Sequence, residues 1–186
     1  MKEKTEKTPQ DIVRNFFKEL VPYVIILFVV ALVRTFIVTP VRVKGSSMYP
    51  YLKEKEILIL NKMDKNYKRF DIIVANTSDL NNKKIIKRII GLPGESIEYK
   101  DCKLYINGEE IKDAVEECIT DDFSLEQIHG YVVIPDNYYF VMGDNRRNSD
   151  DSRGQKIGLI NKNQIQGKAV LRLTPFNRFG SIKYKD

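Results

Sequence analysis

The apolar segment at residues 20–38 is the feature that most constrains this chain, because only Pro22, Tyr23, Arg34 and Thr35 interrupt its aliphatic and phenylalanine side chains. As a helix it would be about 28 Å long, close to the thickness of the hydrocarbon core of a bilayer. Apolar residues would occupy every side of that helix, whereas a helix packed on a protein core keeps a polar face toward water. The segment therefore predicts one transmembrane helix.

Two alternatives to a retained anchor are a core helix and a cleaved secretory signal. A cleaved signal has a shorter apolar core followed by an Ala-x-Ala type of site, which residues 36–40 do not offer. Arg34 lies near one end of the span, where its long side chain can reach the headgroups. We predict a polar tail at residues 1–19, an anchor at 20–39 and a single domain at 40–186. Lys and Arg are nearly balanced on the two sides of the span, so they do not decide its orientation.

The formal net charge of +6 suits either nucleic acid or anionic lipid. The basic residues do not gather into dense clusters with interleaved aromatics, so we predict membrane proximity and no nucleic-acid partner. Cys102 and Cys118 are too few and too far apart for a zinc site, so no metal is expected. Whether they form a disulfide is left open at this point. His129, the only histidine, lies in a polar neighbourhood and is interpreted as a surface residue.

Beyond Pro40 the chain changes to short runs rich in β-branched and aromatic residues, several of them bounded by Gly, Pro, Asn or Asp. The pattern predicts a mostly β, antiparallel domain. Asn107-Gly108 is a hairpin signal, residues 135–137 form a second connection, and residues 113–128 form a loop or short helix. The predicted strands are 56–60, 71–75, 84–90, 103–106, 131–134, 138–142 and 168–173.

Three segments carry residues with possible chemistry, and the first is 45–50, Gly-Ser-Ser-Met-Tyr-Pro. Taken alone it is a turn with two serines, and such turns are common. The functional interpretation is a serine hydroxyl on a tight turn, with backbone N–H groups facing an oxyanion.

The second segment is 85–95, Ile-Ile-Lys-Arg-Ile-Ile-Gly-Leu-Pro-Gly-Glu. In a strand, side chains alternate between faces, so Lys87 would share a face with Ile85 and Ile89. Burial among them would lower the pKa of Lys87 and let it accept a proton near neutral pH. The alternative is that the flexible side chain extends past its neighbours into water.

The third segment is 143–154, Gly-Asp-Asn-Arg-Arg-Asn-Ser-Asp-Asp-Ser-Arg-Gly, directly after an apolar strand. Its composition fits a solvated loop. It also fits a set of short polar side chains that orient a catalytic base, with arginines that neutralise carboxylates.

In order and composition, the three segments together resemble the type I signal peptidases, which cut targeting peptides from exported proteins with a Ser/Lys dyad. The resemblance implies a signal-peptidase-like antiparallel β domain with a small insertion near residues 100–130. It implies Ser47 as nucleophile and Lys87 as general base. Ser149 would hydrogen-bond the Lys87 amine, and Asp151 with Arg153 and Asp144 with Arg88 would form supporting ion pairs. The resemblance also implies shallow apolar pockets for small substrate residues. The positions that would line them are Val43, Met48, Val74 and Ile86.

Three positions depart from the family pattern. Phe70 stands where Gly is common, and Arg147 replaces a residue that is often acidic. Gly45 occupies a position where some relatives have a serine that helps to bind the oxyanion. The backbone N–H of Ser47 would then take that role.

The resemblance implies a membrane-bound serine endopeptidase that acts on exported preproteins. Its tail would lie in the cytoplasm, its catalytic domain would be extracytoplasmic, and it would need no cofactor. Two alternatives remain open: a Ser/Lys protease of the repressor type that cuts itself or one partner, and a non-catalytic binding module tethered to the membrane. Proteases of the first kind are usually soluble, so the apolar segment counts against that alternative. Replacing Ser47 or Lys87 by Ala would abolish cleavage but leave binding intact.

Overall fold

The computed structural model describes residues 9–77 and 83–182 of the chain. It contains two compact units, Met1–Val38 and Thr39–Asp186. The first unit consists of helix α1, Pro9–Phe36, whose part Arg14–Phe36 is long and apolar enough to cross a membrane. The helix starts well before the predicted anchor, so residues 9–19 of the predicted polar tail are helical.

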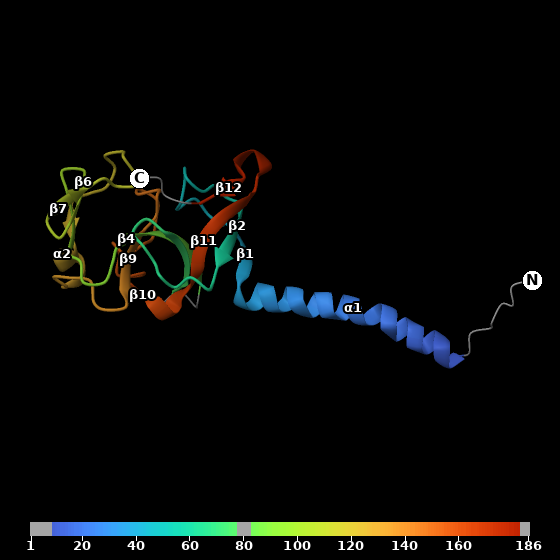
Figure 1. The fold of residues 1–186 in the computed structure, drawn as a ribbon. Helices are drawn as coiled ribbons and strands as arrows, with labels where there is room; N and C mark the ends of the chain where they lie inside the picture. Colours follow the sequence, from blue (N-terminus) through green and yellow to red (C-terminus); the bar gives the residue numbers. More distant parts are fainter. Residues whose placement is uncertain (1–8, 78–82, 183–186) are drawn as a thin grey trace, which may run out of the picture. The chain divides into compact units, whose positions relative to one another are not determined.

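The second unit is built mainly of antiparallel strands, which confirms the predicted fold class (Figure 1). Within the described ranges, eight strands form one sheet in the order β1-β2-β11-β3-β4-β9-β10, with β12 beside β11. Four more strands form a second sheet in the order β7-β6-β5-β8. The strands of the large sheet are β1 Val38–Arg42, β2 Ile57–Asn61, β3 Ile72–Asn76, β4 Lys84–Gly91, β9 Tyr138–Met142, β10 Ile160–Asn161, β11 Ile165–Thr174 and β12 Gly180–Ser181.

The small sheet is made from the region near residues 100–130 that was predicted to be an insertion. Figure 1 shows β6 and β7 at the end of this unit that lies away from β2 and β11. Helix α2, Leu125–His129, follows β8 directly, and two 3-10 turns, Lys162–Gln164 and Phe176–Arg178, flank β11. The strands of the small sheet are β5 Ile97–Lys100, β6 Lys103–Ile106, β7 Glu109–Ile111 and β8 Phe123–Ser124.

One apolar cluster joins the two sheets. It contains Ile97 and Leu104 of the small sheet together with Phe140 and Met142 of β9, all of them buried. Burial of side chains of this size contributes roughly 2 kcal/mol each to folding. The small sheet is therefore packed onto the large one, and side chains from one can reach the segment that follows β9.

Most of the predicted elements are present. The Asn107-Gly108 turn connects β6 to β7, with both residues at positive φ, as this kind of hairpin requires. The predicted strand at 131–134 is wrong: Tyr131, Val132 and Val133 are exposed and irregular, and only Ile134 is buried. Its apolar run matched the composition of a strand, but none of the strands described in residues 9–77 and 83–182 pairs with it.

Cys102 and Cys118, whose pairing the sequence left open, form a disulfide with a Cα–Cα distance of 5.0 Å. It joins the β5–β6 turn to the segment that precedes β8. The segment 113–128 contains irregular chain and the short helix α2, as predicted, but also strand β8, which the sequence did not indicate.

Candidate active site

The segment with Ser47 is a turn that follows β1 and is held by backbone hydrogen bonds. The Tyr49 N–H donates to the Ser46 carbonyl (3.0 Å), and the Leu52 N–H donates to the Met48 carbonyl (2.8 Å). Met48 and Leu52 are fully buried, which anchors the turn in the core, while Ser47 itself stays partly exposed. The turn therefore presents the Ser47 hydroxyl from a fixed backbone.

Lys87 lies in β4, between β3 and β9 in the interior of the large sheet, and pairs with Ile73. It is 4% exposed, and burial lowers its pKa to about 8. The nearby carboxylate of Asp151 opposes this shift but does not cancel it. A large fraction of Lys87 is therefore neutral slightly above neutral pH, as a general base requires.

Gly143 is the point where the three predicted segments meet. Its neighbour Met142 pairs with Arg88, so continuing the register by one residue brings Gly143 across from Lys87. A Cβ atom at position 143 would overlap both the Ser149 hydroxyl and the Ser47 carbonyl oxygen, so only glycine fits there. The Asn145 N–H also donates to the Ser47 carbonyl (3.0 Å). The nucleophile candidate, the base candidate and the third segment are thus neighbours in space.

Ser149 lies beside this point, but its contacts differ from those expected. Its hydroxyl oxygen is buried and has no hydrogen-bond partner, so the expected bond to the Lys87 amine is absent from this structure. Within residues 9–77 and 83–182, no hydrogen bond joins the Lys87 amine to Ser47. Hydrogen bonds among catalytic groups are often long before substrate binds, so this geometry does not argue against the three residues acting together.

The ion pair between Asp151 and Arg153 is present, with the Arg153 Nε 2.8 Å from a carboxylate oxygen. The Asp151 carboxylate also accepts a hydrogen bond from the Gly143 N–H (3.0 Å). The pair therefore supports the backbone at the meeting point of the three segments.

The ion pair between Arg88 and Asp144 is present as well. Both side chains are 3% exposed, and two parallel hydrogen bonds of 2.8 and 2.7 Å join them. Arg88 also donates to the Phe70 carbonyl (2.9 Å). Phe70 has φ +68°, a conformation that favours glycine, which fits the glycine that the resemblance implies at this position. Its buried ring offsets the strain by packing between the two sheets.

The four residues predicted to line apolar substrate pockets gather in one place. Val43, Met48 and Val74 belong to one buried cluster, and Ile86 packs against it. Val74 and Ile86 face each other across β3 and β4. Of the four, only Ile86 is partly exposed. The other three are buried, so they shape the surface from beneath and offer little exposed area for contact.

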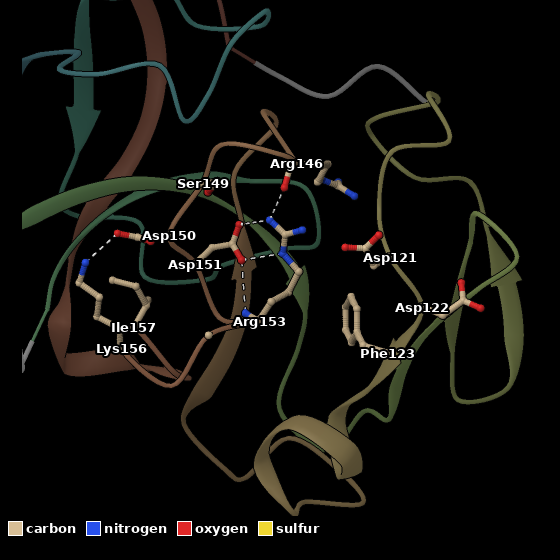
Figure 2. Close-up of a pocket in the computed structure, with 11 residues that line it drawn as sticks. Asp121, Asp122, Phe123, Arg146, Ser149, Asp150, Asp151, Arg153, Lys156 and Ile157 are labelled. Carbon is tan, nitrogen blue, oxygen red and sulfur yellow. Dashed lines mark hydrogen bonds and ion pairs between the residues drawn. The ribbon is translucent and has the colours of Figure 1, made fainter.

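A hollow of about 390 Å³ lies beside the third segment (Figure 2). Ser149 and Asp151 lie on one side of it, and Asp121 and Phe123 from the β8 region lie on the other. Neither Ser47 nor Lys87 lines it. The hollow therefore adjoins the candidate site without containing its reactive groups. Among the residues that the structure describes, no group of three or more His, Cys, Asp or Glu could hold a metal ion.

Several contributors to the site were not singled out from the sequence. The Asn145 and Asn148 side chains donate to the carbonyl and hydroxyl of Ser46, which fixes the nucleophile turn (3.1 Å each). Their position in the third segment could have marked them as candidates.

His129, interpreted as a surface residue, is half-buried with its Nε2 2.6 Å from the Ser152 carbonyl. Arg146 is buried, although nothing in the sequence distinguished it from the exposed Arg147.

Known proteins are similar to most of this chain. The family model "Signal peptidase, peptidase S26" matches residues 14–174. Signal peptidase I S of Bacillus subtilis is 42% identical, over 83% of this chain and 86% of its own length. Signal peptidase I of Bacillus amyloliquefaciens is 38% identical, over 98% of this chain and 100% of its own length.

Among solved structures, a crystal structure of a signal peptidase I from Enterococcus faecalis is similar to part of the chain. The TM-score is 0.50 and the identity 38%, covering 55% of this chain and 96% of the other.

Proposed function

Because the chain belongs to the signal peptidase family, peptidase S26, whose signal peptidase I members are serine endopeptidases, we propose that it removes N-terminal signal peptides from exported preproteins with a Ser47/Lys87 dyad. The observation that carries the proposal is the meeting of the Ser47 turn, the buried Lys87 and the third segment around Gly143. A non-catalytic binding module would not need a buried lysine with a lowered pKa at that point.

In the first half of the reaction, neutral Lys87 takes the proton of the Ser47 hydroxyl as its oxygen attacks the substrate carbonyl. The tetrahedral oxyanion is stabilised by the Ser47 backbone N–H. Protonated Lys87 then gives the proton to the leaving amine, and the mature protein departs. An acyl-enzyme on Ser47 remains.

In the second half, Lys87 accepts a proton from water, which attacks the acyl carbonyl, and the proton returns to the Ser47 oxygen as the signal peptide leaves. No metal or cofactor takes part in either half. The substrate binds as an extended chain, and small side chains before the cut fit against Val43, Met48, Val74 and Ile86.

The same proposal places the protein in the membrane by α1, with its tail in the cytoplasm and its β-rich domain outside. The disulfide between Cys102 and Cys118 supports this orientation, because such bonds persist in oxidising compartments. Exported preproteins present their cleavage sites on that side, so location and substrate agree.

The test is cleavage of a preprotein with an Ala-x-Ala site by the full chain in detergent. Ser47→Ala should lower kcat by at least about 10⁴-fold, because a missing nucleophile removes the covalent route. Ser181→Ala, at an exposed serine in β12, is the matched control and should leave kcat unchanged. Cleavage by Ser47→Ala at a rate near that of the unmodified protein would refute the assignment.

A further inference from the structure

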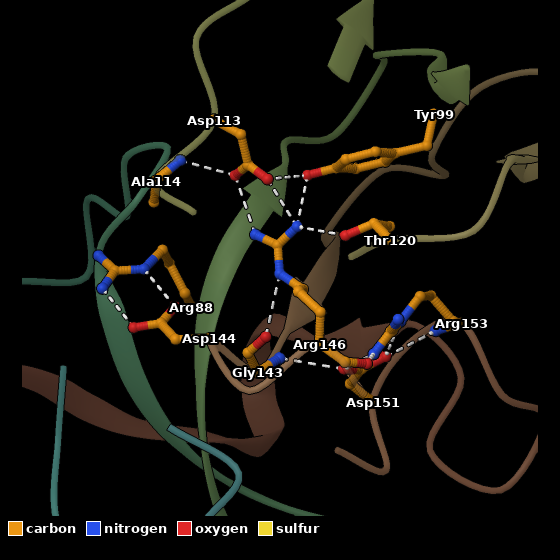
Figure 3. Close-up of polar contacts among 10 residues, drawn as sticks. All are labelled: Arg88, Tyr99, Asp113, Ala114, Thr120, Gly143, Asp144, Arg146, Asp151 and Arg153. Carbon is orange, nitrogen blue, oxygen red and sulfur yellow. Dashed lines mark hydrogen bonds and ion pairs between the residues drawn. The ribbon is translucent and has the colours of Figure 1, made fainter. Parts of the chain in front are cut away.

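Arg146 is a buried arginine that links the small sheet to the segment after β9 (Figure 3). Its side chain is 1% exposed and forms an ion pair with Asp113 (2.6 Å). The same guanidinium donates to the Tyr99 hydroxyl (2.6 Å) and to the Thr120 hydroxyl (3.2 Å). All three partners come from the small sheet or its loops, so one side chain gathers them at the boundary between the two sheets.

The partners of Arg146 are themselves fixed. The Tyr99 ring is buried, which raises the pKa of its hydroxyl and keeps it protonated, so it donates to the Asp113 carboxylate. The Ala114 N–H donates to the other oxygen of that carboxylate (2.6 Å). Asp113 also lies within the loop closed by the disulfide between Cys102 and Cys118. The acceptor for Arg146 is therefore held from several directions.

At its other end, Arg146 holds the candidate active site. Its Nε donates to the Gly143 carbonyl (3.1 Å), and its own carbonyl accepts from the Arg153 guanidinium (2.7 Å). Arg153 is paired with Asp151, which accepts from the Gly143 N–H. Arg146 thus contacts both ends of the segment 143–153, on which Ser149 and Asp151 lie, as Figure 3 shows for all but Ser149.

We propose that Arg146 is a positioning residue for catalysis, which transmits the rigidity of the disulfide-closed small sheet to the segment 143–153 beside Ser47 and Lys87. The inference rests on the proposed function and deepens it, because Arg146 itself touches no reacting atom. Displacing a catalytic group by about 1 Å can cost about 10²-fold in rate. Because Arg146 contacts both ends of this segment, its loss is expected to lower the rate by a similar factor.

The test compares Arg146→Gln, Arg146→Lys and Asp113→Asn in the full chain, with an internally quenched Ala-x-Ala peptide as substrate. Each change should lower kcat by about 10- to 100-fold while KM changes by less than about twofold, because chemistry is misaligned and substrate contacts are intact. Lysine should not rescue, since a single ammonium cannot fork between Asp113, Tyr99 and Gly143.

The pH profile of kcat is the readout that a merely structural brace would not move. The charged groups that act on Lys87 are Asp144, Asp150, Asp151 and Arg153, all in the segment 143–153, and burial dominates the lowering of its pKa. Loosening the segment admits water, so the rising limb of the profile should move to higher pH in all three variants.

A Cys102→Ser/Cys118→Ser variant extends the test to the disulfide. It should show the same fall in kcat to a smaller degree, because Asp113 keeps its other contacts. The inference is overturned if folded Arg146→Gln or Asp113→Asn protein keeps the kcat and pH profile of the unmodified chain. If Arg146→Gln does not fold, Asp113→Asn decides, because it preserves shape and volume. Absence of Ser47-dependent cleavage by the unmodified chain would instead refute the proposed function.

Discussion

Two strand lysines show how differently the two sheets treat the same side chain. Lys87, in the interior of the large sheet, is 4% exposed, and burial lowers its pKa to about 8. Lys103, in β6 of the small sheet, is an exposed lysine whose hydrogen bond to Glu110 (2.7 Å) raises its pKa. Burial governs the first amine and a partner governs the second. An amine can act as a base near neutral pH only in the first environment.

Two other charged side chains buried in the large sheet and the segment after it differ from Lys87, because they are paired with each other. Arg88 and Asp144 are as buried as Lys87, but they neutralise each other through two hydrogen bonds. In the described part of the chain, Lys87 forms no ion pair of this kind, and the carboxylates near it only moderate its pKa. Pairing stabilises a buried charge, whereas lack of a direct partner makes the amine available for proton transfer.

The largest expected difference between the two lysines is in catalysis. Lys87→Met should lower kcat by about 10³-fold or more, because the general base is lost. Lys103→Met should leave kcat unchanged, since its amine is exposed to solvent and paired with Glu110. Peptide cleavage by the full chain at pH 9 measures both, and equal effects of the two substitutions would contradict the assignment of Lys87.

The second prediction concerns the paired charge. Arg88→Met leaves the Asp144 carboxylate buried without its partner and should lower the free energy of unfolding by about 3–5 kcal/mol. Urea unfolding in detergent measures this. The double variant Arg88→Met/Asp144→Leu should recover much of the loss, because replacing both charges by apolar groups removes the unpaired charge. A loss in the single variant no larger than that of Lys103→Met would show that burial of the pair has little energetic consequence.

The third prediction uses pH to separate the two lysines. Unfolded, Lys87 holds its proton to about pH 10.5, but in the fold only to about pH 8. Between these values the unfolded state binds more protons, so stability rises with pH, and below pH 8 the full cost of about 3 kcal/mol applies. Lys87→Met should therefore be more stable than the unmodified protein at pH 7, and the difference should vanish toward pH 10.5.

The shift at Lys103 has the opposite sign. Its contribution to stability is present below pH 10.5 and is lost above the raised pKa, so Lys103→Met should show no gain at pH 7. Activity of the unmodified protein should rise as pH passes about 8, because only the neutral form of Lys87 accepts a proton. Activity that is constant from pH 6 to 10 would contradict both the shift and the role of the amine.

Much of this arrangement follows from local patterns. The alternation of side chains along β4 predicted that Lys87 shares a face with isoleucines. The strand 138–142 and the Asn107-Gly108 turn were predicted correctly, because the sequence pattern of each lies within a few residues. The strand predicted at 131–134 failed because pairing depends on a neighbour that local composition does not reveal. The buried role of Arg146 was missed for the same reason: its partners Tyr99, Asp113 and Thr120 are distant in sequence.

The sequence by itself determined the apolar span, the β-rich character and the ordered segments that contain Ser47 and Lys87, since each depends on residues close together along the chain. The tertiary structure decided which of these groups meet at Gly143, which arginine is buried, and that Cys102 pairs with Cys118. Those outcomes depend on strand order and on the packing of one sheet against another. Contacts of that kind form between segments far apart in the chain, and no local pattern encodes their geometry.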